Sequence, residues 1–498
     1  MPCVHGDRVL VLLFLFSLAA GCVARQAPDA RPMQAIDLAD GSVYSLTASA
    51  VTQTMAGKPE TLYAYNGMLP GPLLKVRQGS RVSIDFRNSL PYDTTVHWHG
   101  VRVAHAFDGV PGVTQEPVKP GETFRYELSF PDEGIYWYHP HLREDRQQEL
   151  GLYGAILVEP RDPVYYNPVD REEVLFLDDL LLEPGGMAGF NEDQATHALM
   201  GRYGNTLFVN WQNNYRLKAG KGQTLRFYLV NAANARPFHF TVEGHPLKLV
   251  GLDSGKPERE ALVEGVVLGP SERAIVELAL EKAGSFKLLN ATPDASYTLG
   301  VLEVEAASAP TPATDFSSPH ANPVLQSSLA PFKALLDQQP DLELELDVEM
   351  QGMDMTPHAL GGAPEPIEWE EGRMAAMNSA STPENTKWIL RDRKTGKENM
   401  DVRFEARAGS IQKIRIHNLA TSAHPMQHPL HLHGNRFLVA SVDGKPNDNL
   451  AWKDSVLVPA GSTVDLLVDF SNPGQWMLHC HIPEHLESGM MALLEVRP

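Results

Sequence analysis

Short segments in which apolar and polar residues alternate recur at three places in the chain, each beginning at a glycine. They have equal length and end in asparagine, at residues 79–88, 222–231 and 409–418. Alternation with a period of two predicts a β-strand with one buried face, and the flanking glycine and asparagine are typical of turns. We therefore expect three equivalent strands.

A second element follows each of these strands and is repeated as well. It is a short run that begins near residue 120, 270 or 460 and leads to Gly134, Gly284 or Gly474. Repeat units of roughly 140–190 residues are too long for a solenoid. The pattern instead predicts an all-β protein built from three tandem copies of one Greek-key β-sandwich domain, with short helices in the connections.

The repeats also give the expected domain boundaries. We place domain 1 at residues 34–160, domain 2 at 161–305 and domain 3 at 336–498, with a Pro/Ser/Ala-rich linker at 306–335. A length of 498 residues agrees with three domains of about 100–200 residues each.

The composition is that of a globular protein, with 43% hydrophobic and 21% charged residues. Lys and Arg number 42 against 62 Asp and Glu, so the formal net charge is −20. This balance argues against nucleic acids and anionic membrane surfaces as partners and is compatible with cationic substrates. The three cysteines, Cys3, Cys22 and Cys480, exclude a disulfide-stapled scaffold.

The N-terminal residues predict export from the cytoplasm. An apolar run at residues 9–20 follows Arg8 and is about half as long as the ~20 residues of a membrane span, so it is typical of a signal peptide. Its end, Leu-Ala-Ala-Gly before Cys22, resembles the lipobox of bacterial lipoproteins. We expect residues 1–22 to be the signal region and the mature protein to be periplasmic or anchored to the outer membrane through a lipidated Cys22. An ordinary cleaved signal peptide is the alternative.

Ten of the 19 histidines lie in four short segments that contain four His-X-His pairs. The segments are His97-Trp-His99, His139-Pro-His141, His428-Pro-Leu-His431-Leu-His433 and His479-Cys-His481-Ile-Pro-Glu-His485. Residues two apart on a strand point to the same face, so each pair can present two imidazoles to one site. Imidazole is a ligand for copper, zinc, iron and nickel. Eight imidazoles exceed the needs of one ion, so several metals are expected between domains 1 and 3, with domain 2 as a spacer.

Cys480 lies between two of these histidines and points to the opposite face of the predicted strand. A thiolate with two histidines and a weak axial methionine is the blue-copper arrangement. His428, His485 and Met490 are the spare donors nearby. The thiolate would be covalently continuous with His479 and His481, which gives an electron a short bonded path between two sites.

These segments resemble the copper-binding motifs of the multicopper oxidases, laccase-like enzymes with three cupredoxin domains. The resemblance covers nearly the whole mature chain and implies four copper ions. A type 1 (blue) copper accepts electrons from a reducing substrate, and a trinuclear cluster of one type 2 and two type 3 coppers reduces dioxygen to water. The implied ligands are His428, Cys480, His485 and axial Met490 for type 1; His97 and His431 for type 2; His99, His139 and His479 for one type 3 copper; and His141, His433 and His481 for the other.

The resemblance also implies two acids that serve the proton demand of dioxygen reduction. Asp108 matches the family acid near the type 2 copper, and Glu484 matches the acid beside the type 3 pair. A positioned general acid typically contributes ~10²–10⁴-fold to a rate. The alternative for each residue is a surface carboxylate.

The electron donor stays open between phenols or aromatic amines, as for laccases, and Cu(I), as for cuprous oxidases. Soft thioethers select Cu(I), and five methionines cluster where cuprous oxidases carry a methionine-rich insert: Met350, Met353, Met355, Met374 and Met377. Ordinary packing is their alternative role. An axial methionine predicts a low to moderate type 1 potential, which favours easily oxidised donors.

The third option is a copper-binding or envelope-assembly protein without turnover. Because one chain carries all four His-X-His pairs, we expect a self-sufficient monomer rather than the ligand-sharing trimer of the copper nitrite reductases.

Overall fold

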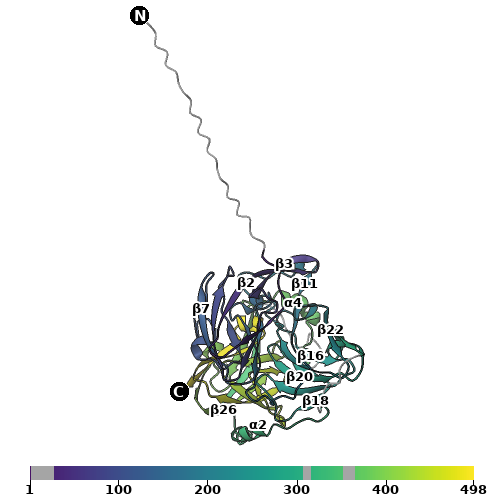
Figure 1. Ribbon diagram of the computed structural model, residues 1–498. Coiled ribbons are helices and arrows are strands. Elements are labelled where there is room, and N and C mark those ends of the chain that lie inside the picture. Colours follow the sequence, from purple (N-terminus) through teal and green to yellow (C-terminus); the bar gives the residue numbers. More distant parts are fainter. Residues whose placement is uncertain (2–26, 307–315, 352–364) are drawn as a thin grey trace.

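The computed structural model describes Met1 and residues 27–306, 316–351 and 365–498 (Figure 1). The predicted signal region with Cys22, part of the predicted linker, and Met353 and Met355 lie outside these residues. None of the helices described is long and apolar enough to cross a membrane. Strands dominate the fold, so the all-β prediction is confirmed.

Two sheets make up the N-terminal part, in the orders β1-β4-β9-β8-β6 and β3-β2-β5-β7. Leu46 and Ile84 of one sheet and Leu74 and Ile156 of the other belong to one buried core. The strands are β1 (Ala35–Leu38), β2 (Val43–Met55), β3 (Lys58–Tyr65), β4 (Leu73–Arg77), β5 (Arg81–Asn88), β6 (His97–His99), β7 (Thr123–Ser129), β8 (Gly134–His139) and β9 (Gly154–Glu159).

The middle part has sheets β13-β10-β15-β20-β17-β18 and β14-β22-β21-β16-β19, with a small β11-β12 ribbon. Its strands are β10 (Arg171–Leu180), β11 (Leu182–Glu183), β12 (Gly186–Met187), β13 (Thr206–Val209), β14 (Tyr215–Gly220), β15 (Thr224–Asn231), β16 (Phe238–Val242), β17 (Leu247–Leu252), β18 (Ala261–Val263), β19 (Gly265–Leu268), β20 (Arg273–Ala279), β21 (Gly284–Ala291) and β22 (Ser296–Glu305).

The C-terminal part has sheets β24-β23-β26-β32-β28-β29, with β30 on β28, and β25-β34-β33-β27-β31. Its strands are β23 (Leu342–Met350), β24 (Thr386–Asp392), β25 (Arg403–Arg407), β26 (Ser410–Asn418), β27 (His428–Leu432), β28 (Arg436–Val442), β29 (Lys445–Pro446), β30 (Trp452–Lys453), β31 (Ser455–Val458), β32 (Thr463–Phe470), β33 (Gly474–Cys480) and β34 (Met491–Arg497).

Helices are short and lie in the connections. The α-helices are α1 (Glu144–Gln147), α2 (Pro323–Ser328), α3 (Ala330–Lys333), α4 (Ala375–Ser379) and α5 (Pro483–Glu487), and the 3₁₀ helices are η1 (His105–Phe107), η2 (Gly372–Met374) and η3 (Asn399–Asp401).

The repeat in the sequence is a repeat in the structure. The three alternating segments form β5, β15 and β26, and each pairs antiparallel with the next repeated element, β7, β20 or β32. The following glycines, Gly134, Gly284 and Gly474, open β8, β21 and β33 with φ of 146°, 152° and 149°. Glycine adopts such positive φ values without the steric cost of a Cβ. The three equivalent strands are therefore confirmed.

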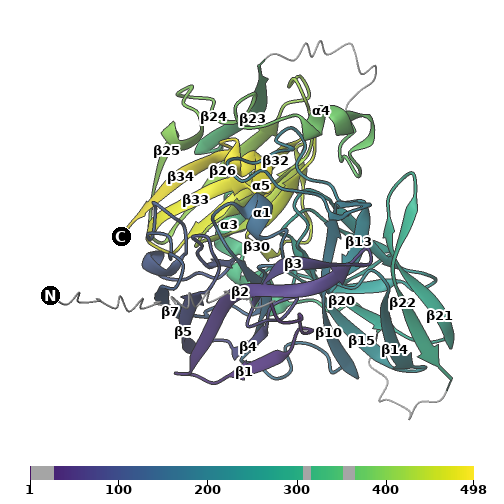
Figure 2. The same cartoon turned by 90° about the horizontal axis from the view of Figure 1, so that it is seen from above.

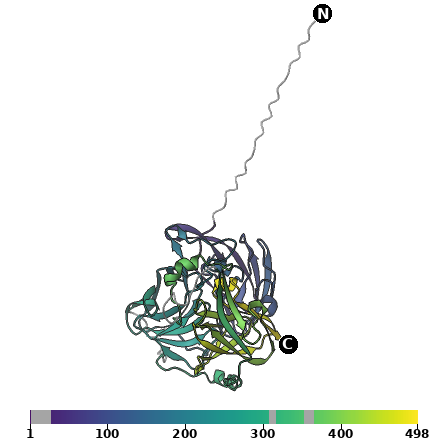
Figure 3. The ribbon, with the colours of Figure 1, turned by 180° about the vertical axis from the view of Figure 1, so that it is seen from behind.

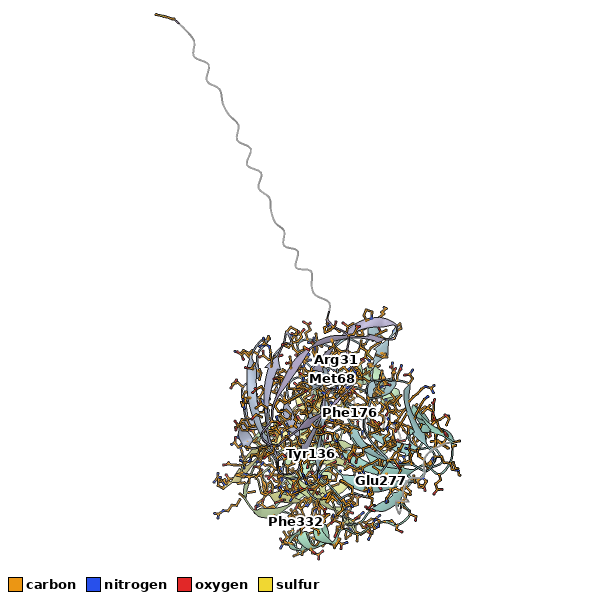
Figure 4. The ribbon with its side chains drawn as sticks, viewed as in Figure 1. Arg31, Met68, Tyr136, Phe176, Glu277 and Phe332 are labelled. Atoms are coloured by element: carbon orange, nitrogen blue, oxygen red, sulfur yellow. The ribbon has the colours of Figure 1, made fainter. Side chains whose placement is uncertain are left out.

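The later half of the predicted linker at 306–335 forms α2 and α3, two of the short helices found in the connections. Leu325, Leu329 and Phe332 of these helices pack in one buried cluster with Trp452 of β30. The rings of Phe332 and Trp452 lie 4.9 Å apart in an edge-to-face arrangement. Figure 4 places Phe332 at the lower edge of the molecule, beside the label of α2 in Figure 1. This apolar docking ties the segment to the C-terminal sheets.

The three parts surround a common centre. In Figure 2 the purple-blue, teal and green-yellow parts are seen separately. Figure 3, the view from behind, shows the teal part beside the yellow strands. Strand β8 contacts β20, and β33 contacts η1. Helix α1 of the first part packs on α5 of the last, as their neighbouring labels in Figure 2 also show. The ends of β8 and β33, which carry histidines, thus meet near this centre.

Candidate metal centre

A buried thiol lies between two imidazoles at the end of β33. The Sγ of Cys480 is 3.7 Å from Nδ1 of His428 on β27 and 3.6 Å from Nδ1 of His485 on α5. The two Nδ1 atoms are 3.3 Å apart. Met490 is 0% exposed, and its backbone carbonyl accepts a hydrogen bond of 3.0 Å from the Cys480 N–H. The structure therefore brings together His428, Cys480 and His485, and it places the backbone of Met490 beside Cys480.

These donors fit a soft metal ion. Burial raises the pKa of the Cys480 thiol and lowers the pKa of His428 to about 3. A neutral imidazole keeps a lone pair for a metal, and a metal stabilises the thiolate that burial alone disfavours. One thiolate with two imidazoles is the donor set of blue-copper sites, so the chemistry of these residues points to copper.

Eight further histidines converge where the first and last parts meet. Strands β6 and β8 pair His97 with His139, and strands β27 and β33 pair His431 with His479. All eight are buried, the most exposed being His141 at 7%. Because strand pairing places each His-X-His segment against another, two imidazoles from each of four chain segments reach one volume.

Within this cluster the histidines form two trios. The Nε2 of His139 is 3.5 Å from Nδ1 of His99 and 3.4 Å from Nε2 of His481. The Nε2 atoms of His433 and His479 are 3.0 Å apart, and the ring of His141 lies 5.1 and 5.2 Å from these two rings.

This grouping corrects the arrangement that the resemblance implied for the type 3 pair. His481, not His479, joins His99 and His139, and His479 joins His141 and His433. The two residues share one face of one strand, so their spacing alone does not determine which of them reaches which trio.

Hydrogen bonds to carbonyl groups fix the proton on one side of several rings. The Nδ1–H of His97 donates to the carbonyl oxygen of Asp108 at 2.8 Å, and that of His431 donates to the carbonyl of Asp454 at 2.8 Å. His139 and His479 donate in the same way to Pro140 and Cys480. A carbonyl only accepts, so Nε2 keeps its lone pair.

Unpartnered ring atoms support a metal at the centre of the cluster. The Nε2 atoms of His97, His141 and His431 are buried without a hydrogen-bond partner. Buried polar atoms are normally hydrogen-bonded, so these unpaired ring nitrogens need an explanation, and a metal ion supplies one. Burial lowers the pKa of the trio histidines, to about 4 for His433 and about 3 for His481. Neutral rings are the form that metals bind.

Both predicted acids are buried, and one of them, Asp108, touches the cluster. Asp108 is 1% exposed, and its Oδ2 accepts a hydrogen bond of 2.7 Å from Nδ1 of His433. Burial acts to raise the pKa of Asp108, but His433 and His97 outweigh it and the pKa is lowered. Glu484 on α5 is 1% exposed and accepts a hydrogen bond from Asn234 at 3.2 Å, while burial raises its pKa to about 8.

Sequence reasoning missed two acidic residues that touch the histidines. Oε1 of Glu144 on α1 is 3.2 Å from Nδ1 of His141, a contact that the three-residue spacing could have suggested. Oδ1 of Asp454 is 3.1 Å from Nε2 of His99. Asp454 stands outside every histidine motif, so no local signal identifies it.

Residues from several segments cover the thiol site. The ring of His485 stacks on Trp388 at 4.2 Å, and Leu199 and Met200 belong to the same buried core as Cys480. Met350, Met374 and Met377 pack against this core. Nearby, Nε2 of His424 and Oε2 of Glu368 are 3.6 Å apart, and both atoms are buried without a hydrogen-bond partner.

Comparison with known proteins gives a consistent result along the whole chain. Three family models described as multicopper oxidase match residues 47–163, 183–305 and 370–498. The multicopper oxidase mco of Staphylococcus haemolyticus is 26% identical over 443 residues, covering 87% of this chain and 83% of that protein. The multicopper oxidase MmcO of Mycobacterium tuberculosis is 26% identical, covering 96% and 94%. A crystal structure of a multi-copper oxidase from Pseudomonas thermotolerans is 27% identical, with a TM-score of 0.69 and coverage of 93% and 100%.

Proposed function

Because this chain belongs to the multicopper oxidase family, we propose that it couples one-electron oxidations of a donor to the four-electron reduction of dioxygen to water. The observation that carries this is the placement of Cys480. Its thiol lies in one donor set, while the residues on both sides of it, His479 and His481, lie in the eight-histidine cluster. Bound copper supplies the one-electron redox chemistry and the dioxygen-reducing centre that these residues themselves lack.

We assign the ligands of four copper ions from the described contacts. His428, Cys480, His485 and Met490 would hold type 1; His97 and His431 would hold type 2; His99, His139 and His481 would hold one type 3 copper; and His141, His433 and His479 would hold the other.

The remaining residues of the site orient ligands, exclude water and supply protons. Asp108 holds His97 through its carbonyl oxygen and His433 through its carboxylate. Glu484 has one carboxyl oxygen bonded to Asn234 and the other buried without a partner. We assign Glu484 and Asp108 as the acids that serve the protons of dioxygen reduction. Because both side chains are only 1% exposed, bulk water does not take over their role as proton donors.

For the donor, the geometry favours Cu(I) over a phenol. His485 is 0% exposed, so a bulky ring has no direct access to its imidazole. A single ion needs less room, and three methionines, with the unpartnered atoms of His424 and Glu368, lie around the same core. A phenol is the second candidate, because Tyr203, Arg236 and Tyr297 line a cavity of about 280 Å³. The hydroxyl of Tyr203 accepts a hydrogen bond from Gln427, the neighbour of His428.

Oxygen uptake by the copper-loaded protein tests the function and the donor together. Cu(I) and dimethoxyphenol serve as parallel donors, the phenol with and without added Cu(II). Higher kcat/KM for Cu(I), with phenol oxidation dependent on added copper, supports the cuprous oxidase. Fast phenol turnover without added copper supports a laccase. No uptake with either donor, in a protein that shows no blue absorption after copper loading, would leave a non-catalytic copper-binding or envelope-assembly role.

A methionine variant pair sharpens the donor test. Replacing Met374 and Met377 together by Leu conserves apolar volume and removes two thioethers. If Cu(I) is the donor, KM for Cu(I) rises and KM for the phenol stays constant. The matched control is Met33→Leu, because Met33 packs against a different core. Equal effects of the two sets of changes would return Met374 and Met377 to packing.

We also propose export and action as a monomer. The N-terminal residues support a signal region ending near Cys22, which a lipid would anchor to the membrane. Mass spectrometry of the mature N-terminus and fractionation of Cys22→Ala against the unchanged chain test the lipid. Sedimentation of the copper-loaded protein tests the monomer.

A further inference from the structure

Two buried aspartates hold the histidine cluster in matching ways. Asp108 binds His97, of its own domain, through the backbone carbonyl, and binds His433 of the third domain through the carboxylate. Asp454 binds His431, of its own domain, through the backbone carbonyl, and its Oδ1 lies 3.1 Å from Nε2 of His99 of the first domain. Each aspartate thus supports one histidine of its own domain and one histidine across the interface.

The two aspartates differ in what holds them. The ion pairs of the described residues give Asp108 only histidine partners. Asp454 is instead clamped by Arg273 of the middle domain, whose Nη1 and Nη2 donate to Oδ1 and Oδ2 at 2.5 and 2.6 Å. Both side chains are 0% exposed. A bidentate arginine fixes the plane of a carboxylate as well as its position.

The guanidinium group is also held by the first domain. Its Nε donates to the carbonyl oxygen of Ile135 on β8 at 2.9 Å. Its face lies 5.7 Å from the ring of Tyr136, which Figure 4 labels near the middle of the molecule. Arg273 therefore joins the middle domain to the strand that ends in His139 and to the residue that supports His99.

Ser271, two residues before this arginine, makes a second contact between the middle and third domains. The hydroxyl of Ser271 donates to Oγ of Ser455 at 3.1 Å. Oγ of Ser455 lies 3.0 Å from Nε2 of His99 and 3.3 Å from Nδ1 of His431. Ser271 is 0% exposed, so this contact is sheltered from water.

Both residues depart from the threefold repeat at this turn. The equivalent positions are Gly121 and Thr123 in the first domain and Gly461 and Thr463 in the third. Gly121 and Gly461 have φ of 82° and 74°, and Ser271 has φ of 71°. A serine in this left-handed region is uncommon, because its Cβ is crowded there. The middle domain thus keeps a strained serine and a buried arginine at a turn that faces Asp454 and Ser455.

The first histidine motif leaves room for the clamp. Gly100, directly after His99, has φ of +81°, and a Cβ built there would lie 2.4 Å from Oδ2 of Asp454 and 2.8 Å from Nη2 of Arg273. A side chain at position 100 and the arginine–aspartate pair exclude each other. This close approach is a packing reason for the glycine that ends the motif.

From these contacts we propose that the middle domain, which supplies no ligand, positions the trinuclear cluster: Arg273 and Ser271 hold Asp454 and Ser455, which orient His99 and His431. The proposal rests on the copper-binding function proposed above. Arg273 and Ser271 act through other residues and touch no reacting atom, so they are positioning residues. Loss of a residue that orients a metal ligand typically weakens metal binding or activity by 10–100-fold.

Arg273→Lys and Ser271→Gly test the proposal in the copper-loaded full chain. The lysine keeps the charge and loses the bidentate fork, and the glycine restores the residue of the other two repeats. For both, copper retention is measured against a chelator, with the type 2 signal in electron paramagnetic resonance and the near-ultraviolet absorption of the type 3 pair. The blue absorption of type 1 copper in the same sample is the internal reference. Arg226→Lys is the matched control, because Arg226 forms a buried pair with Glu277 at 2.7 Å in the same domain.

We expect Arg273→Lys to retain the cluster coppers about 10–100-fold more weakly and to alter the type 2 signal, with the blue absorption unchanged. Ser271→Gly is expected to cost about tenfold in retention while the unfolding temperature stays equal or rises, because glycine relieves the strained backbone. Should Arg273→Lys not fold, Ser271→Gly decides.

Wild-type signals in both variants, with retention equal to that of Arg226→Lys, would overturn the positioning role alone. A lower unfolding temperature with unchanged copper signals would reduce Arg273 to an ordinary domain contact. A wild-type protein without any of the copper signals would overturn the proposed function and this inference with it.

Discussion

A buried carboxyl away from the metal site gives the most quantitative prediction. Asp178 on β10 is 4% exposed; its Oδ2 accepts a hydrogen bond of 2.5 Å from the Tyr153 hydroxyl, and its Oδ1 accepts one of 2.8 Å from the Asp179 N–H. Burial raises the pKa of Asp178 from 3.8 to about 7, and the neighbouring carboxylate of Asp179 adds to the rise. The replacement Asp178→Asn removes this titration and conserves the shape of the side chain.

The size and sign of the effect follow from linkage. A pKa that rises from 3.8 to about 7 on folding corresponds to about 4 kcal/mol, at about 1.4 kcal/mol per pH unit. Because the folded-state pKa is the higher one, this stabilisation is fully present below about pH 4 and is lost as the pH rises through about 7. Roughly 2.5 kcal/mol of the loss falls between pH 5 and pH 8. Asn has one carbonyl oxygen for the two donors, the Tyr153 hydroxyl and the Asp179 N–H. The free energy of unfolding of the variant is therefore lower by about 1 kcal/mol at every pH.

Urea unfolding of wild type and Asp178→Asn with equal copper content, at several pH values from 5 to 8, measures the difference. Over this interval, we expect the free energy of unfolding of the variant to rise by roughly 2.5 kcal/mol relative to that of the wild type, because only the wild type loses the bound proton. Asp448→Asn is the control, since it is the same chemical replacement at a side chain that is 91% exposed. Parallel stability curves for wild type and Asp178→Asn would refute the reasoning that burial dominates this pKa.

Two further predictions concern the proposed copper sites, and a third concerns a tightly packed glycine. Cys480→Ser removes the thiolate, so blue absorption and donor oxidation are expected to vanish while the type 2 signal persists; absorption and electron paramagnetic resonance measure both. Glu484→Gln conserves the contact with Asn234 and removes the acid, so steady-state oxygen uptake should fall ~10²–10⁴-fold. Single-turnover reduction of the blue copper by the donor should stay unchanged, and an unchanged uptake would remove Glu484 from the proton supply. Gly434→Ala places a Cβ 2.2 Å from the Trp476 ring at φ of +59°, whereas Gly112→Ala at φ of +72° meets no atom within 4 Å. The first variant is expected to lower the unfolding temperature more than the second, because both carry about 1–2 kcal/mol of backbone strain and only the first adds a clash.

The sequence was sufficient for the repeated strands and for naming histidines and a cysteine that meet in the candidate metal centre. Strand alternation and turn glycines are local, and they located β5, β15 and β26 to within two residues. The His-X-His and His-Cys-His segments are local as well, so each donor could be named before its partners were known. The sequence does not tell which of His479 and His481 belongs to which trio, because both lie on one face of the same strand. This assignment depends on how two strands from different domains are placed in space.

The supporting residues escaped prediction for a different reason. Arg273 lies at the start of β20, Asp454 lies between β30 and β31, and His99 ends β6, so three domains must assemble before their contact exists. A buried arginine and aspartate have no spacing rule that sequence reasoning could use. The docking of α2 and α3 was not predicted for a related reason: the composition of this segment is typical of linkers, although three of its apolar residues pack with Trp452.

The two kinds of support for the rings respond differently to substitution. His139 and His479 donate to the carbonyl oxygens of the residues that follow them, Pro140 and Cys480, so a side-chain change leaves these hydrogen bonds in place. His99 depends on the Asp454 carboxylate, whereas His431 depends on the Asp454 carbonyl. Asp454→Asn therefore changes the partner of His99 and keeps that of His431. It should weaken copper retention about 10–100-fold with a larger change in the type 3 absorption than in the type 2 signal. Equal perturbation of both signals would mean that Asp454 positions the whole loop rather than one ring.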